Sequence, residues 1–142
     1  SIPVIIDPMN NIPNSFDQLG ARSDTAALLE KAGVKVMFTV PRDHNYHLIR
    51  QGAGNAVANG MSYAAAINGL SGVVSDVFNI KGRGKLKKGF YADLVIWDGD
   101  PLEPASMPTH VIINGELSDL TSRSSRLMER YTSGEDKPNT YR

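Results

Sequence analysis

The chain has 142 residues, 41% of them hydrophobic and 21% charged, which is enough for one globular domain with a hydrophobic core. Fifteen basic and fifteen acidic residues give a formal net charge of zero, so we expect neither a nucleic-acid nor a membrane partner. Because the chain has no cysteine, disulfides, thiolate metal sites and cysteine nucleophiles are excluded. No apolar run approaches the roughly 18 residues that span a bilayer. The sequence therefore indicates a soluble protein and leaves cytoplasm and periplasm equally open.

The first forty residues have the pattern of a βαβ unit. A strand is predicted over 2–6 (IPVII), and a loop rich in proline and asparagine follows it. Ser23 or Asp24 is the expected cap of a short helix that Gly33 ends. A second strand is predicted over 34–40 (VKVMFTV). A right-handed crossover would place the two strands side by side and parallel.

Two helices and a β module are expected in the rest of the chain. The first helix is predicted over 47–59, Gly60 breaks it, and the second starts at Ser62 and is followed by a helical turn in the segment GVVSDVFNI. From Gly82 onwards the pattern indicates a basic strand, then the strand ADLVIW, then a hairpin that turns at Asn114-Gly115. The β module is therefore predicted over 85–117, with a frayed polar tail and one possible helical turn after it.

The strongest candidate site is the stretch FTVPRDHNYH at residues 38–47. It follows the carboxyl end of a predicted parallel strand, which is where α/β sheets and barrels place their sites. Asp43 could bind a metal or act as a general base, and His44 and His47 could bind metal or substrate. An ordinary helix cap made by Asp43 or Asn45 explains the same residues equally well.

The loop after the first strand leads to the same edge of the predicted sheet. Asp7, Asn10 and Asn11 follow that strand, so they are the nearest candidates to share a site with Asp43. A complete zinc site needs three or four protein ligands, and the sequence supplies no convincing set.

Three other features favour structural explanations. KGRGKLKKG, at 81–89, lacks the spacing of a nucleotide-binding loop, so a solvated hairpin is the better interpretation. Trp97 is expected in the core or an interface, and His110 at a surface or strand edge.

The second half of the chain resembles a known family. The segment GKLKKGFYADLVIWDGDPLEPASMPTHVIINGEL resembles the C-terminal signature of the amidohydrolase superfamily, in the group related to imidazolonepropionases and prolidase-like enzymes. AGNAVANGMSYAAAINGLS resembles the helical pair that joins the last barrel strand to a small β-sandwich. The resemblance covers residues 2–127 and is most specific in its second half.

The resemblance implies an α/β fold made of a partial (β/α)8 barrel, namely its last two βα units, followed by a small C-terminal β-sandwich segment. IPVII would be the seventh barrel strand and VKVMFTV the eighth. The implied divisions are 1–80 for the barrel part, 81–120 for the sandwich segment and 121–142 for a partly disordered tail.

The resemblance also implies a divalent metal, zinc being the first choice, in the intact enzyme. Most family ligands lie on earlier barrel strands, so this chain would supply only the aspartate after the eighth strand. Asp43 is the residue nearest that place and would bind metal and take a proton from water; His44, Asn45, Asn10 and Asn11 would lie beside the substrate. Alignment puts Arg42 at the expected position of the aspartate, so either the loop is shifted by one residue or the ligand is lost and this chain holds no metal.

Two functions follow as hypotheses. The first is a C-terminal portion of a metal-dependent amidohydrolase that cleaves an amide or other C–N bond of a small molecule and is inactive as an isolated chain. The second is a non-catalytic accessory module derived from that fold. Both predict a partner, either the missing N-terminal part of the barrel or another chain, with a homo-oligomer as one form. A third, weaker idea is a free-standing metal module built on Asp43, His44 and His47.

Overall fold

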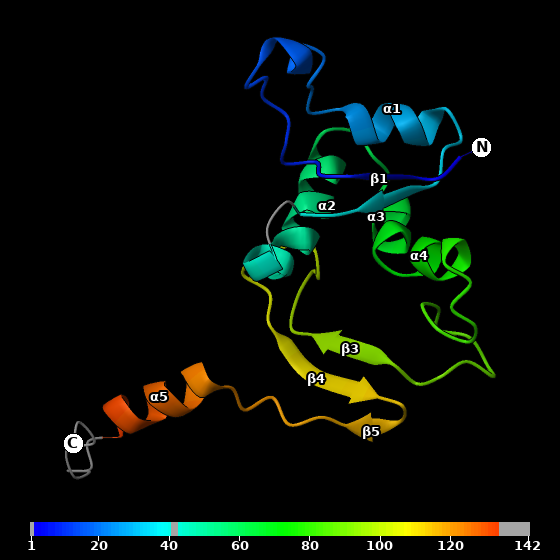
Figure 1. Cartoon of the computed structure of the whole chain (residues 1–142). Helices are drawn as coiled ribbons and strands as arrows, with labels where there is room; N and C mark the ends of the chain where they lie inside the picture. The colour runs from blue at the N-terminus through cyan, green and yellow to red at the C-terminus, as the bar shows by residue number, and fades with distance from the viewer. Residues whose placement is uncertain (1, 41–42, 134–142) are drawn as a thin grey trace.

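The computed structural model describes residues 2–40 and 43–133, and the side chains of residues 43–45 lie outside that description. Two small sheets are separated by helices, and one further helix lies on the far side of the first sheet (Figure 1). In the described part of the chain, no helix is long and apolar enough to cross a bilayer.

The first sheet is the predicted parallel pair. β1 (Val4–Ile6) pairs with β2 (Val36–Phe38) in parallel, with Val4 opposite Val36 and Ile6 opposite Phe38. Between them lie a 3-10 helix, η1 (Phe16–Gln18), and the helix α1 (Thr25–Lys31). Gly33 adopts φ +73°, the left-handed conformation predicted for the end of α1. The βαβ prediction is therefore confirmed.

The N-terminus of α1 differs from its prediction in one respect. Asp24 occupies the N-cap position, but its side chain makes no capping hydrogen bond. Its carboxylate instead accepts hydrogen bonds from the Arg22 guanidinium, including one of 2.8 Å from Nη2 to Oδ2. The charged partner two residues away competes successfully for the oxygens that would otherwise cap the helix.

The helices that follow β2 have the predicted order. η2 (Asp43–Leu48) leads into α2 (Ile49–Ala58), and Gly60, at φ +99°, separates α2 from α3 (Tyr63–Leu70). Ser62 caps α3 by accepting a 3.2 Å hydrogen bond from the Ala65 amide, as an N-terminal serine should. α4 (Gly72–Val77) is the predicted helical turn.

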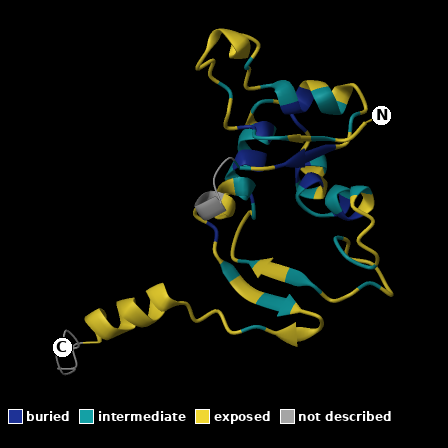
Figure 2. Ribbon diagram, viewed as in Figure 1, coloured by how far each residue is buried: buried dark blue, intermediate teal, exposed yellow. Residues whose placement is uncertain are grey.

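The hydrophobic core lies between the first sheet and these helices. Small residues of α1, α2 and α3 pack against β2, which lets the helix backbones come close to the strand. Figure 2 shows buried residues on β2 and on the helices beside it. The core members are Ala26, Ala27, Val36, Phe38, Ala53, Ala56, Met61, Ala66 and Leu102. Gly69 shows how tight the packing is, because a Cβ built there would lie 2.8 Å from the Val36 carbonyl oxygen.

The second sheet is antiparallel and has the order β3 (Leu94–Trp97), β4 (Pro108–Ile113), β5 (Glu116–Leu117). Asn114 and Gly115 have φ of +55° and +87°, as the predicted Asn-Gly hairpin turn requires. The hairpin prediction is confirmed, but the β module starts at Leu94 rather than at residue 85.

The predicted basic strand within residues 82–89 is wrong. This segment forms turns and bends, and Gly82, Gly84 and Gly89 all have positive φ, which an extended strand excludes. Lys85 pairs with Asp76 at 2.7 Å and Arg83 pairs with Asp93, so its charges bind neighbouring acidic groups. The sequence pattern suggested a strand, but the positive φ angles of the glycines turn the backbone instead.

The tail also contains more structure than one helical turn. α5 (Arg123–Thr132) is a ten-residue helix with a capping box between Ser122 and Ser125. None of its residues is buried, and it projects away from both sheets (Figures 1 and 2).

Candidate functional site

The backbone brings the two predicted site loops to one edge. Ile6 and Phe38 are register partners at the ends of β1 and β2, so the loop that begins at Asp7 and the segment that leads to η2 leave the same edge of the sheet. This is the carboxyl edge on which α/β proteins build their sites. The side chains of Asp43, His44 and Asn45 lie outside the described residues, so their predicted roles stay predictions.

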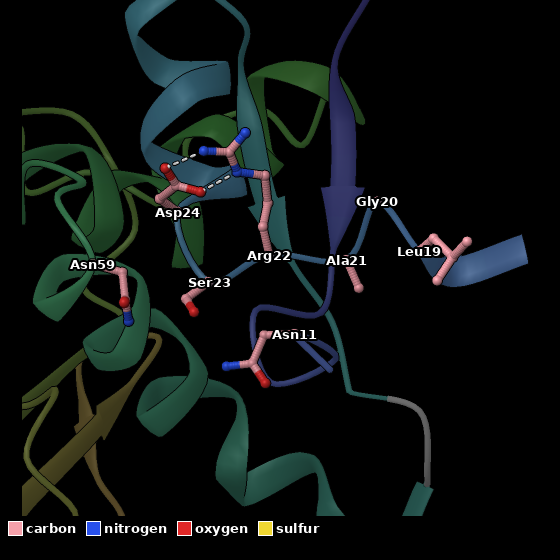
Figure 3. A pocket seen from close by; sticks show the side chains of 8 residues that line it. All are labelled: Asn11, Leu19, Gly20, Ala21, Arg22, Ser23, Asp24 and Asn59. Carbon is pink, nitrogen blue, oxygen red and sulfur yellow. Dashed lines mark hydrogen bonds and ion pairs between the residues drawn. The ribbon is translucent and has the colours of Figure 1, made fainter. Parts of the chain in front are cut away.

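Asn10 and Asn11 lie in two adjoining hollows beside this edge. The smaller hollow, of about 240 Å³, contains Asp7 and Asn10 together with residues from the start of α1. The larger one, of about 600 Å³, contains Asn11 and the loop before α1 (Figure 3). Ala21, Arg22 and Ser23 line both hollows, which makes the two a continuous region.

The larger hollow is polar on several sides. Asn59, at the C-terminal end of α2, faces the loop that carries Asn11 and Ser23 (Figure 3). The Asn59 amide nitrogen donates to the Asn55 carbonyl oxygen at 2.8 Å, so that side chain is held in place by its own helix. Amide and hydroxyl groups on opposite walls can form hydrogen bonds with a small polar molecule.

The two charged side chains that line the larger hollow, Arg22 and Asp24, pair with each other. The hydrogen bond from Arg22 holds the pKa of Asp24 below its ordinary value, and the same contact raises the pKa of Arg22. Both groups are therefore ionised at neutral pH and neutralise each other. The Arg22–Asp24 pair gives the hollow a fixed dipole rather than a net charge.

Asp7 has a local role at the start of the loop. Its carboxylate oxygen Oδ1 accepts a 3.0 Å hydrogen bond from the Met9 amide, and its carbonyl oxygen accepts one of 3.2 Å from the Asn10 amide. An aspartate bonded to the backbone two residues on is the usual start of a turn. Asp7 thus shapes the loop that places Asn10 and Asn11 in the hollows.

His47 is exposed and lies on the surface of η2. Its ring stands edge-on to the Tyr46 ring, with the centroids 6.1 Å apart and an angle of 83° between the planes. Among the described residues there is no group of three histidine, aspartate or glutamate side chains that could hold a metal ion. The described part of the chain therefore does not fit a metal centre of its own, and the free-standing module of Asp43, His44 and His47 stays an untested hypothesis.

The remaining candidates have structural surroundings. Trp97 is half-buried beneath Arg50, whose guanidinium carbon lies 4.7 Å from the ring centroid. His110 is exposed, and its Nδ1 lies 3.2 Å from the Thr109 hydroxyl, as expected for a histidine on a strand surface. In both cases the contacts agree with the structural interpretation of the sequence.

Arg22, Ser23 and Asn59 were not predicted as members of the candidate site. The Arg22-Ser23-Asp24 stretch offered a signal, because oppositely charged residues two positions apart before a helix can pair and expose the residue between them. The sequence offered no signal for Asn59, because only the packing of α2 beside the loop brings this residue to the hollow.

Comparisons with known proteins agree on one family. Residues 5–118 match the amidohydrolase family. A segment of 57 residues is 40% identical to the amidohydrolase tasK of Hapsidospora irregularis, covering 39% of this chain and 6% of that protein. The crystal structure of an amidohydrolase from Thermotoga maritima MSB8 superposes with a TM-score of 0.71 at 23% identity, over 82% of this chain and 31% of that one. The chain thus spans less than a third of the length of either relative.

Proposed function

Because this chain belongs to the amidohydrolase family, we propose that it is the C-terminal portion of a metal-dependent hydrolase that cleaves an amide or other C–N bond of a small molecule. The observation that carries the proposal is the shared edge of β1 and β2, from which both candidate loops leave beside two polar hollows. In this proposal β1 and β2 are the seventh and eighth strands of the barrel, and β3–β5 belong to the sandwich. The imidazolonepropionase-related or prolidase-like group is the proposed subgroup.

Asp43 is the residue we propose for the chemistry. It is the first residue of η2, the element that follows β2, and it is the carboxylate nearest the place where the family resemblance expects an aspartate. A divalent metal, zinc being our first choice, would acidify the attacking water when bound. The family resemblance places the remaining ligands on earlier barrel strands, outside this chain, and the described residues contain no set of three ligands. Asp43 would take the proton from the water, and Asn10 and Asn11 would form hydrogen bonds with the substrate.

The surface of the chain supports a missing partner segment. Ile5, on the face of β1 away from the core, is 51% exposed, although it belongs to a continuously apolar strand. A second apolar region is a groove of about 720 Å³ between α3 and β3, lined by Tyr63, Ile67, Leu86 and Val95 among others. β3 is an edge strand of its sheet, so its free edge can pair with an extended segment. We propose that the N-terminal part of the enzyme covers both surfaces.

Activity assays test the proposal. The 142-residue chain, supplied with Zn²⁺, should hydrolyse no N-acyl amino acid or dipeptide, whereas the polypeptide that also contains the N-terminal barrel strands should hydrolyse at least one. In that longer protein Asp43→Asn should lower kcat by about 10²- to 10⁴-fold, the usual range for a general base. Robust turnover by the isolated chain would refute its proposed inactivity.

The second candidate is a non-catalytic accessory module. Arg42, at the aligned position of the metal-binding aspartate, favours it, because a positive guanidinium there disfavours a divalent cation. The two candidates differ in the longer protein. If Asp43→Asn and Asp43→Ala both leave its activity unchanged while Zn²⁺ binding is also unchanged, the accessory module is the correct function.

A further inference from the structure

Arg50 makes an unusual set of contacts with a single loop. Its four terminal N–H groups donate to four backbone carbonyl oxygens in the connection between β3 and β4. Nη1 donates to Pro101 at 3.0 Å and to Glu103 at 2.6 Å, and Nη2 donates to Pro104 and Ser106, both at 3.0 Å. The guanidinium therefore fills a cage of carbonyl oxygens that no neutral side chain could satisfy.

The planar shape of the guanidinium is essential to this cage. The same group lies over the Trp97 ring, 4.7 Å from its centroid, at the end of β3. Arginine can stack on an aromatic face and donate in its own plane at once, whereas the lysine ammonium is a point donor with three N–H groups.

The loop that forms the cage also packs on α2 next to Arg50. Gly54, one helical turn after Arg50, meets the loop closely, because a Cβ built there would lie 2.9 Å from the Leu102 carbonyl oxygen. Leu102 is 5% exposed and belongs to the main core. Asp100 adds a third attachment by accepting hydrogen bonds from the Tyr63 hydroxyl at 2.9 Å and the Leu102 amide at 2.8 Å. The connection between β3 and β4 is thus docked on the helices as a unit.

Arg50 also has a special position in the chain. It is the second residue of α2, and η2, which begins with Asp43, ends two residues before it. Contacts that fix the position of Arg50 therefore also restrain the C-terminal end of η2.

We propose that Arg50 is a positioning residue: it couples the second sheet to the site, so that the β3–β4 connection holds η2 and Asp43 in place. This assignment rests on the proposed role of Asp43, but the coupling itself is a property of the folded chain. The connection between β3 and β4 would then help to position the candidate site.

Amide hydrogen exchange of the 142-residue chain, followed residue by residue by NMR, tests this coupling. Arg50→Ala should accelerate exchange at residues 46–48 by at least about tenfold, because several charge-assisted hydrogen bonds are lost. Exchange of the Ala66 amide, which donates to the Ser62 carbonyl oxygen within α3, should not change. Millimolar ethylguanidinium, far below the molar concentrations of guanidinium that unfold proteins, should restore slow exchange by refilling the cage.

Two further variants make the outcome decisive. Arg50→Lys should give an intermediate acceleration, and it serves as the test if Arg50→Ala does not fold. Arg83→Lys is the matched control, because Arg83 also lies over an aromatic ring, that of Tyr91 at 4.3 Å, but pairs with Asp93 rather than with a carbonyl cage. It should leave residues 46–48 unchanged.

Two results would overturn the proposal. One is an equal acceleration at residues 46–48 and at Ala66, which would mean that Arg50 supports only global stability. The other is unchanged exchange at residues 46–48 in Arg50→Ala. Since no turnover is measured, failure here is separate from failure of the proposed hydrolase activity.

Discussion

The two sheets of this chain are buried to very different extents. All three residues of β2 are buried, whereas the described strands of the second sheet contain no buried residue. The buried anchors of the second sheet, Leu102 and Ser106, lie instead in the connection between β3 and β4. The first sheet is thus held in the core by β2, and the second by a loop. Strands therefore pair in the second sheet without contributing a buried residue to the core, and this exposure supports the proposal that a further segment covers that sheet.

The largest expected effect tests the asymmetry between the sheets directly. Phe38→Ala in β2 should lower the free energy of unfolding by about 3–5 kcal/mol, because it leaves a cavity in the main core. Ile96→Ala in β3 is the matched change, and because that side chain is 47% exposed it should cost less than about 1 kcal/mol. Urea denaturation followed by circular dichroism measures both. Equal losses would show that the two sheets are equally buried in solution.

A smaller effect tests how the first sheet and its helices are held together. Glu30, on α1, accepts hydrogen bonds from the Ser62 amide at 2.8 Å and hydroxyl at 2.5 Å, at the start of α3. The Ser62 contacts lower the pKa of Glu30. The ionised form is therefore the stabilising one: its contribution is complete above the pKa of the unfolded chain and is lost as the pH falls through the lower folded pKa.

Glu30→Gln should accordingly lower stability at pH 7 by about 1 kcal/mol, because a charged acceptor is replaced by a neutral one, and flatten the loss of stability in acid. Urea midpoints measured between neutral and acid pH, in the variant and the parent chain, provide the comparison. Ser62→Ala should reduce the pH dependence similarly, and the double variant should add little. An unchanged acid slope in Glu30→Gln would show that this contact does not form in solution.

The smallest effect concerns α5. Because no residue of this helix is buried, removing residues 119–142 should change the urea midpoint by no more than the equivalent of about 0.5 kcal/mol. The far-ultraviolet circular dichroism should lose the helical signal of α5. A clear fall in the midpoint would mean that the tail packs against one of the sheets.

Local patterns in the sequence were sufficient for much of the fold. The apolar runs of β1 and β2, the helix break at Gly60, the helix start at Ser62 and the Asn114-Gly115 turn are all confirmed, because each depends on residues within a few positions of one another. Family membership was likewise visible in the sequence and is confirmed. The prediction of a basic strand within 82–89 is wrong because three glycines of this segment adopt positive φ, which turns the backbone.

The candidate site was predictable only in part. Asn10 and Asn11 could be placed at the sheet edge because their loop follows a strand, and both line hollows there. Asn59 could not be predicted as a site residue, since it lies at the end of α2 and reaches the hollow only through the packing of that helix. The roles of Asp43, His44 and Asn45 stay predictions.

The sequence by itself therefore determined the elements whose hydrogen bonds join residues within one turn, one cap or one hairpin. Tertiary structure alone decided three other features. It turned Arg50 toward carbonyl groups some fifty residues later in the chain, it brought Glu30 to Ser62 at the start of α3, 32 residues away, and it placed Leu102 in a core otherwise built from the first half of the chain. The physical reason is that these contacts join groups far apart in sequence, so they form only once packing has fixed where each element lies.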